Sequence, residues 1–417
     1  MQTSLERIAN KARNSKEHRF QNLSRLLNQK FLFNAWSKLN KKSAPGIDGL
    51  TYQEYDKDIV SNIEKLMIKV KGKSYRAKLV RRQYIPKGNG KLRPLGIPAL
   101  EDKLLQYGVT QILQAIYEED FLPCSFGYRP KRGALDAVRE LRNNLSERGA
   151  NYVVEADIKG FFDNLDHDWL IRMLEQRIDD RAFLQLINKW LKAGILDTDY
   201  KILHPTTGTP QGGIVSPILA NIYLHYVLVL WFEKVVKRHC KGKARLYLYA
   251  DDFVCVFENK YDALRFYKVL RKRFEKFGLS LAEEKTNLIP FTPYSNDKFD
   301  FLGFEFRPTR SRKTRVKIRT SRSKLQQSMR NVKEWIKTNR HKKRCEHFAE
   351  LNVKLQGYYN YYGIKGNYRS LSEFHWIVVQ SLYKWLNRRS QRKSYTVEKF
   401  TKVLKFYNIV KPRITEH

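Results

Sequence analysis

The chain contains 417 residues with a mass of 49.5 kDa, which at about 150 residues per domain predicts two or three domains. Hydrophobic residues make up 42% of it and aromatic residues 13%, which excludes wholesale disorder. Its 80 Lys and Arg outnumber 42 Asp and Glu, and the resulting formal charge of +38 favours a polyanionic partner. Residues 301–417 hold 29 basic and 7 acidic residues, so we expect this last part to bind nucleic acid.

Cysteine usage and hydropathy predict the compartment. The four cysteines are scattered singly, which argues against a zinc module or a secreted disulfide scaffold and favours a reducing cytosol. The longest apolar run, Tyr226 to Phe232, is far shorter than the ~20 residues that span a bilayer. The first twenty residues lack the apolar segment of a signal peptide. We therefore expect a cytoplasmic protein with no membrane partner.

Helices and strands alternate through the first 300 residues. Residues 1–40 predict an amphipathic helix, which Pro45 and two glycines end before a second helix. Asn89-Gly90 predicts a hairpin within 81–98. Further on we expect helices over 100–118 and 133–148, a strand over 151–156, helices over 167–193, an apolar helix from Ser216, two strands over 245–257, a helix over 261–277 and a strand pair over 285–306. After Pro308 the pattern is helical, basic and aromatic to about Arg389.

Three aspartates follow or interrupt apolar strands. Asp251 and Asp252 lie between the strands of 245–257, and adjacent acids can share one site only at a turn, because neighbouring side chains of a strand point to opposite faces. Asp157 ends another apolar strand. If the strands are neighbours, three carboxylates converge and repel one another, which divalent ions such as Mg²⁺ would relieve. An isolated Asp-Asp pair is usually a solvated hairpin tip, but the apolar strands and the third aspartate favour the metal site.

The segment Tyr249-Ala250-Asp251-Asp252 resembles the YxDD box of reverse transcriptases. Seven further segments occur in the family's order, and together with this box they resemble the block series of group II intron-encoded reverse transcriptases over about residues 20–390. The seven segments are KKSAPGIDG (41–49), RRQYIPKGNGKLRPLGIP (81–98), SFGYRPKRGALDAV (125–138), VEADIKGFFDNLDHDWL (154–170), GTPQGGIVSPILANIYL (208–224), EEKT (283–286) and FLGFEF (301–306).

The resemblance implies an α+β fold of the right-hand polymerase type, whose fingers and palm contain an antiparallel sheet and helices, followed by an α-helical thumb. The domains implied are an N-terminal helical extension over 1–40, fingers and palm over 41–308, a thumb or maturase domain over 309–390, and a short basic tail over 391–417. The tail is a candidate for a reduced DNA-binding element. It lacks cysteine, and we expect no HNH endonuclease.

The resemblance also implies roles at the catalytic centre. Asp157 and Asp251 would be the principal metal ligands, Asp252 a supporting one, and the backbone carbonyl of Ile158 a further one. They would hold two Mg²⁺ ions, which Mn²⁺ can replace. The strand pattern described above predicts the same three aspartates but does not rank Asp251 against Asp252.

Five residues are implied in nucleotide binding, each with a structural alternative. Phe162 would be an aromatic gate against the 2′-hydroxyl, unless it is core like Phe161. The cations Lys87 and Arg93 would bind the triphosphate, unless the hairpin is only solvated. Gln211 would contact nucleotide or template, or simply belong to a loop-to-helix turn. Lys285 would meet the departing pyrophosphate or form a surface ion pair.

The remaining candidates would bind nucleic acid. Cations beside aromatic residues suit a single-stranded template, although the aromatic residues near them, Phe126 and Tyr128, could equally be structural. Gly212 and Gly213 carry no side chain and would allow close approach. Basic residues at the start of the thumb would contact primer-template. The cations are Arg129, Lys131, Arg132, Arg310, Arg312, Lys313 and Arg315.

The implied function is RNA-directed DNA polymerase with maturase activity. It extends a DNA or RNA primer with dNTPs on an RNA template by two-metal phosphoryl transfer, and binds intron RNA to assist splicing and mobility. A homodimer is one option for its assembly. Two alternatives stay open: a non-catalytic splicing maturase, and a host-adapted reverse transcriptase in defence or repair.

Overall fold

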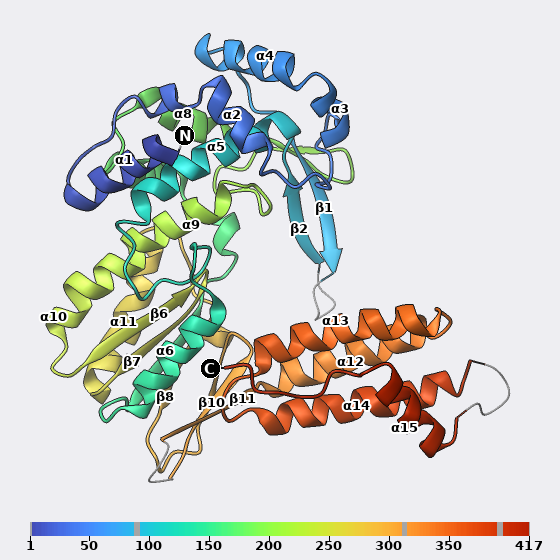
Figure 1. Ribbon diagram of the computed structural model, residues 1–417. Helices are drawn as coiled ribbons and strands as arrows, with labels where there is room; N and C mark the ends of the chain where they lie inside the picture. Colours follow the sequence, from blue (N-terminus) through green and yellow to red (C-terminus); the bar gives the residue numbers. More distant parts are fainter. Residues whose placement is uncertain (1, 87–91, 311–314, 390–394, 417) are drawn as a thin grey trace. The chain divides into compact units, whose positions relative to one another are not determined.

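The computed structural model describes residues 2–86, 92–310, 315–389 and 395–416. Chain contacts divide it into two compact units, coloured along the sequence in Figure 1. The N-terminal unit comprises Met1–Ala137 and Val154–Leu288, and the C-terminal unit comprises Val138–Val153 and Ile289–His417. This division by contacts lies twenty residues before the predicted domain boundary at 308, and most of the helix predicted over 133–148 joins the second unit.

The N-terminal unit begins with short helices rather than the single helix predicted over 1–40. Phe20 interrupts the helical path, because its backbone N–H donates to Arg177 O at 2.7 Å and its carbonyl accepts from Asp179. The helices in order are α1 (Gln2–Asn14), η1 (Leu23–Leu26), α2 (Gln29–Trp36), α3 (Tyr52–Lys57), α4 (Ile59–Lys71), α5 (Leu100–Tyr117), η2 (Phe161–Asp163), α7 (His167–Glu175), α8 (Arg181–Leu191), α9 (Ser216–Leu224), η3 (His225–Val229), η4 (Phe232–Val236), α10 (Lys237–His239), α11 (Lys260–Glu275) and η5 (Glu283–Lys285), while α6 (Ala134–Ser146) crosses the unit boundary.

Two sheets shape this unit. The first has the order β2-β1-β4-β5 and contains the predicted hairpin, in which Ile85 pairs with Arg93; its tip, residues 87–91, lies outside the described residues. The second has the order β6-β7-β3-β8, with Tyr249 paired to Asp252 where β6 turns into β7. The strands are β1 (Val80–Pro86), β2 (Leu92–Ile97), β3 (Tyr152–Asp157), β4 (Ile195–Leu196), β5 (Ile202–Leu203), β6 (Ala244–Tyr249), β7 (Asp252–Phe257) and β8 (Asn287–Pro290).

One helical stretch of the described residues, Ser216–His239, is long and apolar enough to cross a membrane, with a mean hydropathy of 1.3. It combines α9 and α10 with the π-helical segments η3 and η4, so it is longer than the apolar run that the sequence suggested. In its most apolar window 67% is buried inside the protein, and the Tyr223 hydroxyl donates to Phe277 O at 2.6 Å. This burial is typical of a core helix.

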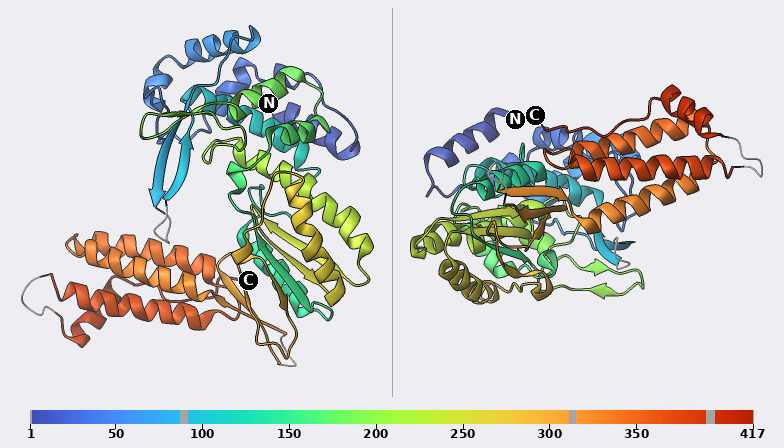
Figure 2. Two further views of the ribbon diagram at one scale, coloured as in Figure 1. Left: turned by 180° about the vertical axis from the view of Figure 1, so that it is seen from behind. Right: turned by 90° about the horizontal axis from the view of Figure 1, so that it is seen from below.

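The C-terminal unit joins a three-stranded sheet to a helical bundle. The sheet has the order β11-β10-β9, and Phe304 on β10 lies 5.6 Å from the ring of Tyr361 on α13. This packing explains why the unit begins before residue 308. Figure 2 shows the long helices, in orange and red, running side by side. The elements are β9 (Phe299–Phe301), β10 (Phe304–Pro308), β11 (Val316–Thr320), α12 (Arg322–Thr338), α13 (Arg344–Tyr362), α14 (Tyr368–Leu386) and α15 (Val397–Phe406).

The described part of the predicted tail is integrated into this bundle. Phe400 on α15 and Ile409 after it are buried in one hydrophobic core with Leu351 and Leu382. At the end of the chain, the Glu416 carboxylate forms an ion pair with Arg142 on α6. Burial alone would raise the pKa of Glu416, but its hydrogen bonds to Arg142 and to a backbone N–H lower that pKa overall. The sequence predicted a separate basic element, because its charge pattern does not reveal that its apolar residues face the bundle.

Candidate active site

The predicted aspartates lie where neighbouring strands of the second sheet end and begin. Asp157 closes β3, and Asp252 opens the adjacent β7 after the turn that carries Asp251. Burial raises the pKa of Asp251, the Asp157 carboxylate raises it further, and Lys285 and Arg93 lower it. Four charged side chains from four separate segments therefore lie within electrostatic range of one another.

A neighbouring loop fixes the turn that carries Asp251. Ala250 has a φ of 55°, in the left-handed region that residues other than glycine seldom adopt. The backbone of Phe126 donates to Leu248 O at 2.9 Å, which places Gly127 directly against the turn. A Cβ on Gly127 would lie 2.4 Å from the Ala250 nitrogen. The loop and the turn thus hold each other at backbone contact.

Lys285 is the counter-ion of Asp157. Its ammonium donates to the Asp157 carboxylate, and this hydrogen bond raises the pKa of Lys285. The backbone supports the pair, since Ala282 donates to Asp157 O at 2.8 Å. The alternative from the sequence was an ion pair, and Lys285 does form one, with Asp157, while the adjacent Glu283 pairs with Arg271.

The donor set suits a hard divalent ion that also binds substrate. Ile158 forms an isolated antiparallel β-bridge. The hydrogen bonds on either side of it run from Ala282 N to Asp157 O and from Lys159 N to Ser280 O. In this hydrogen-bond pattern the carbonyl oxygen of Ile158 points away from the partner strand. Across the described residues, no group of three or more His, Cys, Asp or Glu side chains is arranged to hold a metal ion. Two carboxylates and a carbonyl still fit Mg²⁺, which binds one or two carboxylates plus substrate phosphates rather than an all-protein cage.

Besides Lys285, three of the residues predicted to bind nucleotide lie in the described part of this unit. Phe161 is buried whereas Phe162 is partly exposed, with its ring centroid 6.2 Å from that of Tyr128. Arg93 is exposed on β2 and acts electrostatically on Asp251. The Gln211 amide donates to Asp163 at 3.3 Å. Lys87 falls outside the described residues, so its predicted contact stays a prediction.

Comparison with known proteins decides the family. Residues 85–306 match the family described as reverse transcriptase (RNA-dependent DNA polymerase), and residues 325–404 match the group II intron maturase-specific domain. The group II intron-encoded protein LtrA of Lactococcus lactis is 30% identical over 91% of this chain and 76% of its own length. The chain belongs to the group II intron-encoded reverse transcriptases.

Two further proteins are similar over large parts of this reverse transcriptase. Protein YkfC of Escherichia coli is 31% identical over 67% of this chain and 81% of its own. A telomerase structure from Candida albicans aligns with 86% of this chain and 64% of that chain, at 14% identity and a TM-score of 0.49.

The family match confirms the predicted fold class and function. The chain is an RNA-directed DNA polymerase with a maturase domain that binds RNA, and its family uses divalent metal ions. The maturase match ends at residue 404, inside α15. It therefore extends beyond the predicted thumb boundary at 390, in agreement with the buried position of Phe400.

Arg129 has a structural place in this reverse transcriptase rather than an open one. Its side chain is 7% exposed and pairs with Glu118 at 3.0 Å. It also donates to the carbonyls of Leu122 and Ser125, each at 2.9 Å. A guanidinium so engaged has few donors left for a template, and the predicted nucleic-acid contact of this residue stays a prediction. The sequence shows a cation beside aromatic residues but not which way it points.

The neighbouring candidates differ from one another. Lys131 is exposed, and the Arg132 guanidinium lies over the Phe126 ring at 5.1 Å and donates to Pro123 O. Gly212 is exposed with a φ of 114°, and a Cβ there would lie 2.7 Å from the Gly96 carbonyl. Gly213 is buried. The two glycines thus permit close protein packing, and their predicted approach to nucleic acid stays a prediction.

Of the four thumb cations, two lie outside the described residues, Arg312 and Lys313. Arg310 lies over the Tyr294 ring at 5.9 Å and is exposed. Arg315 donates to Glu147 O at 2.5 Å within the C-terminal unit. Their nucleic-acid contacts stay a prediction.

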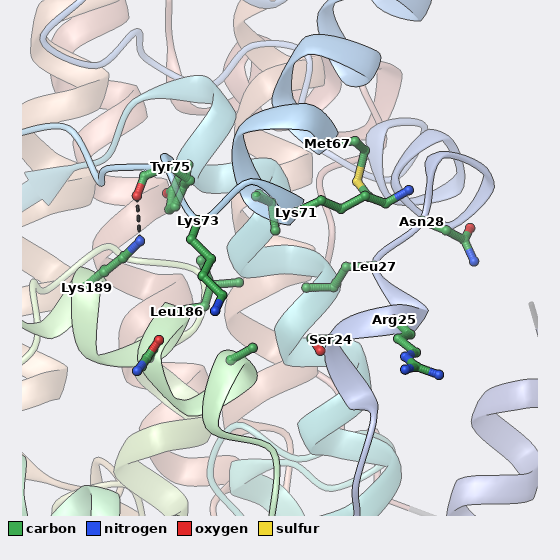
Figure 3. A pocket seen from close by; sticks show the side chains of 13 residues that line it. Ser24, Arg25, Leu27, Asn28, Met67, Lys71, Lys73, Tyr75, Leu186 and Lys189 are labelled. Atoms are coloured by element: carbon green, nitrogen blue, oxygen red, sulfur yellow. Dashed lines mark hydrogen bonds between the residues drawn. The ribbon is translucent and has the colours of Figure 1, made fainter.

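A separate basic cavity of 380 Å³ lies in the N-terminal unit, lined by none of the predicted site residues (Figure 3). Its lining combines apolar side chains such as Leu27 and Leu186 with Arg25 and three lysines. One of them, Lys189, donates to the Tyr75 carbonyl at 2.6 Å. Its described lining contains no acidic side chain, so its charge suits an anion.

Gly127 should be intolerant of a side chain. In Gly127→Ala the new methyl group would displace the Ala250 backbone and with it Asp251, so we expect primer extension to fall at least about tenfold, the effect of ~1.4 kcal/mol in the transition state. Gly357→Ala is the matched control, because a Cβ at that position meets nothing within 4 Å. Extension rates are compared between variants that have the same melting temperature. Wild-type activity of Gly127→Ala would contradict the contact between Gly127 and the Ala250 turn.

Proposed function

We propose that this reverse transcriptase extends a primer 3′-hydroxyl with dNTPs on an RNA template, using two Mg²⁺ ions bound by Asp157, Asp251 and Asp252 with the Ile158 carbonyl. The observation that carries this proposal is the electrostatic coupling of Asp157 and Asp251 across adjacent strands, with two cations beside them. When bound, the two ions would stabilise the charge on the attacking and leaving oxygens. Mn²⁺ is expected to replace Mg²⁺ because both accept the same oxygen ligands.

The protein's own residues would bind and orient the substrate. Arg93 is always protonated and can contact phosphate through two N–H groups, and with Lys87 it would hold the triphosphate. Lys285 would transfer its interaction from Asp157 to the departing pyrophosphate. Gln211 would position the nucleotide or template. Lys131 and Arg132 would add template contacts, and Arg310 and Arg315 would add primer-template contacts.

The experiment is primer extension by the full chain on poly(rA)/oligo(dT) with dTTP, with and without Mg²⁺, and with Mn²⁺ in its place. We expect synthesis only with a divalent ion, and its abolition by chelation. Template-bound protein that never incorporates nucleotide under any of these conditions would contradict the proposal and favour a non-catalytic splicing maturase.

Phe162 would select deoxynucleotides. The adjacent Phe161 is buried in the core and Phe162 is partly exposed beside Tyr128, so Phe162 is the ring available to clash with a 2′-hydroxyl. We expect Phe162→Ala to reduce the preference for dNTP over rNTP by roughly 10²-fold, within the range that a small change of pocket shape produces. The measurement is kcat/KM for each nucleotide. Phe161→Ala should instead lower stability with the preference intact, and the reverse pattern would exchange the two roles.

As a maturase, the protein is also proposed to bind its parent intron RNA and assist splicing and mobility. The formal charge of +38 and its concentration in the C-terminal part support this. We further propose a cytoplasmic location and a homodimer as one form of assembly. Splicing of a precursor that contains the intron, assayed at increasing salt with and without protein, tests the maturase activity independently of DNA synthesis.

A further inference from the structure

Tyr128 occupies an unusual position beside the catalytic turn. It has a φ of 56°, in a region that L-residues other than Asn and Asp seldom adopt and that is often found at functional sites. The residue is 47% exposed, although the nearby Phe126 is buried and the side chain of the following Arg129 is only 7% exposed. The strained conformation therefore turns an aromatic ring outward from a fixed loop.

Three contacts hold that loop in place. Phe126 is fully buried and its backbone pairs with Leu248. The buried Asn221 amide donates to Gly127 O at 2.8 Å. Arg129 donates to Ser125 O, which closes the turn around Tyr128. A ring carried by such a loop has little freedom to move away.

The ring faces the site on two sides. Burial raises the pKa of the Tyr128 hydroxyl, Asp251 raises it further, and Arg93 lowers it. Its ring meets the Phe162 ring edge-on, at 77° and 6.2 Å between centroids, a favoured geometry for an aromatic pair. Tyr128 thus lies beside the catalytic aspartate, the predicted triphosphate cation and the predicted gate together.

We propose that Tyr128 is a positioning residue that holds the Phe162 ring against the nucleotide sugar and so sets the preference for deoxynucleotides. The inference rests on the proposed function of Phe162. Without the Tyr128 ring, Phe162 retains its contact with Phe161 at 5.5 Å but loses its neighbour on the exposed side and can rotate away. A ribose 2′-hydroxyl then meets less resistance.

The test measures kcat/KM for dNTP and rNTP in the full-length protein. Tyr128→Ala should lower the preference for dNTP about tenfold, mainly through a lower KM for rNTP. Tyr128→Gly is the second variant, because glycine accepts a φ of 56° without strain and should fold even if the alanine variant does not. Tyr128→Phe keeps the ring and should keep the preference, since the Tyr128 hydroxyl has no hydrogen-bond partner among the described residues.

Two controls make the result decisive. Tyr200 is also a tyrosine with positive φ, at 62°, and is 86% exposed; Tyr200→Ala should leave the preference unchanged. Because Tyr128 acts through Phe162, adding Tyr128→Ala to Phe162→Ala should cause no further loss. An unchanged preference in Tyr128→Ala and Tyr128→Gly, or full additivity with Phe162→Ala, would overturn the inference. Wild-type protein that incorporates neither nucleotide would instead refute the proposed function.

Discussion

Asp251→Asn should abolish primer extension while leaving RNA binding nearly unchanged. The substitution keeps the size of the side chain and removes the charge that would bind metal at the β6–β7 turn. Metal stabilisation of transition-state charge is worth several kcal/mol, and each 1.36 kcal/mol is tenfold in rate, so we expect a loss of at least about 10³-fold. The measurement is the rate of dTTP incorporation on poly(rA)/oligo(dT), alongside the affinity for the same duplex.

Asp168→Asn is the matched control. Asp168 is exposed on α7, so the same change of charge there should not alter the rate. A fall in RNA affinity equal to the fall in rate would show that Asp251 supports binding rather than chemistry. Full-rate synthesis by Asp251→Asn would remove this residue from the catalytic centre.

Phe400→Ala should destabilise the C-terminal unit. Phe400 is 4% exposed, and its ring lies 5.2 Å from that of Tyr383 on α14. Truncation of a buried phenylalanine costs about 3–5 kcal/mol, which for a unit of this size lowers the melting temperature by roughly 10 °C. Calorimetry of the full chain should show the unfolding transition of the C-terminal unit at a lower temperature and the other transition unchanged.

Phe406→Ala on the same helix supplies the comparison, because Phe406 is 80% exposed and its truncation should change stability by no more than about 0.5 kcal/mol. If α15 were instead an independent DNA-contacting element, Phe400→Ala would weaken DNA binding without moving either transition. Equal effects of the two substitutions would contradict the assignment of α15 to the core of the bundle.

The sequence and the structure agree best where chemistry constrains residue type. The YxDD turn and the strand that ends in Asp157 were predictable from their apolar strands, and the hairpin that carries Arg93 was predictable from Asn89-Gly90. The structure adds the surroundings of Arg129, whose guanidinium donates to Glu118, and of Gly213, which is buried. From the sequence, Tyr128 was identified only as an aromatic residue near basic ones. Its position directly after Phe126-Gly127 was the feature that could have indicated its importance.

The amino-acid sequence by itself determined the family and the polymerase function, because the ordered series of short segments depends on residue type along the chain; the three aspartates stay a prediction. Only the tertiary structure decided that Lys285 neutralises Asp157 and that the basic tail belongs to the bundle. Each of these depends on which distant segment contacts a side chain, and the type of a charged or apolar residue does not identify that segment before the chain has folded.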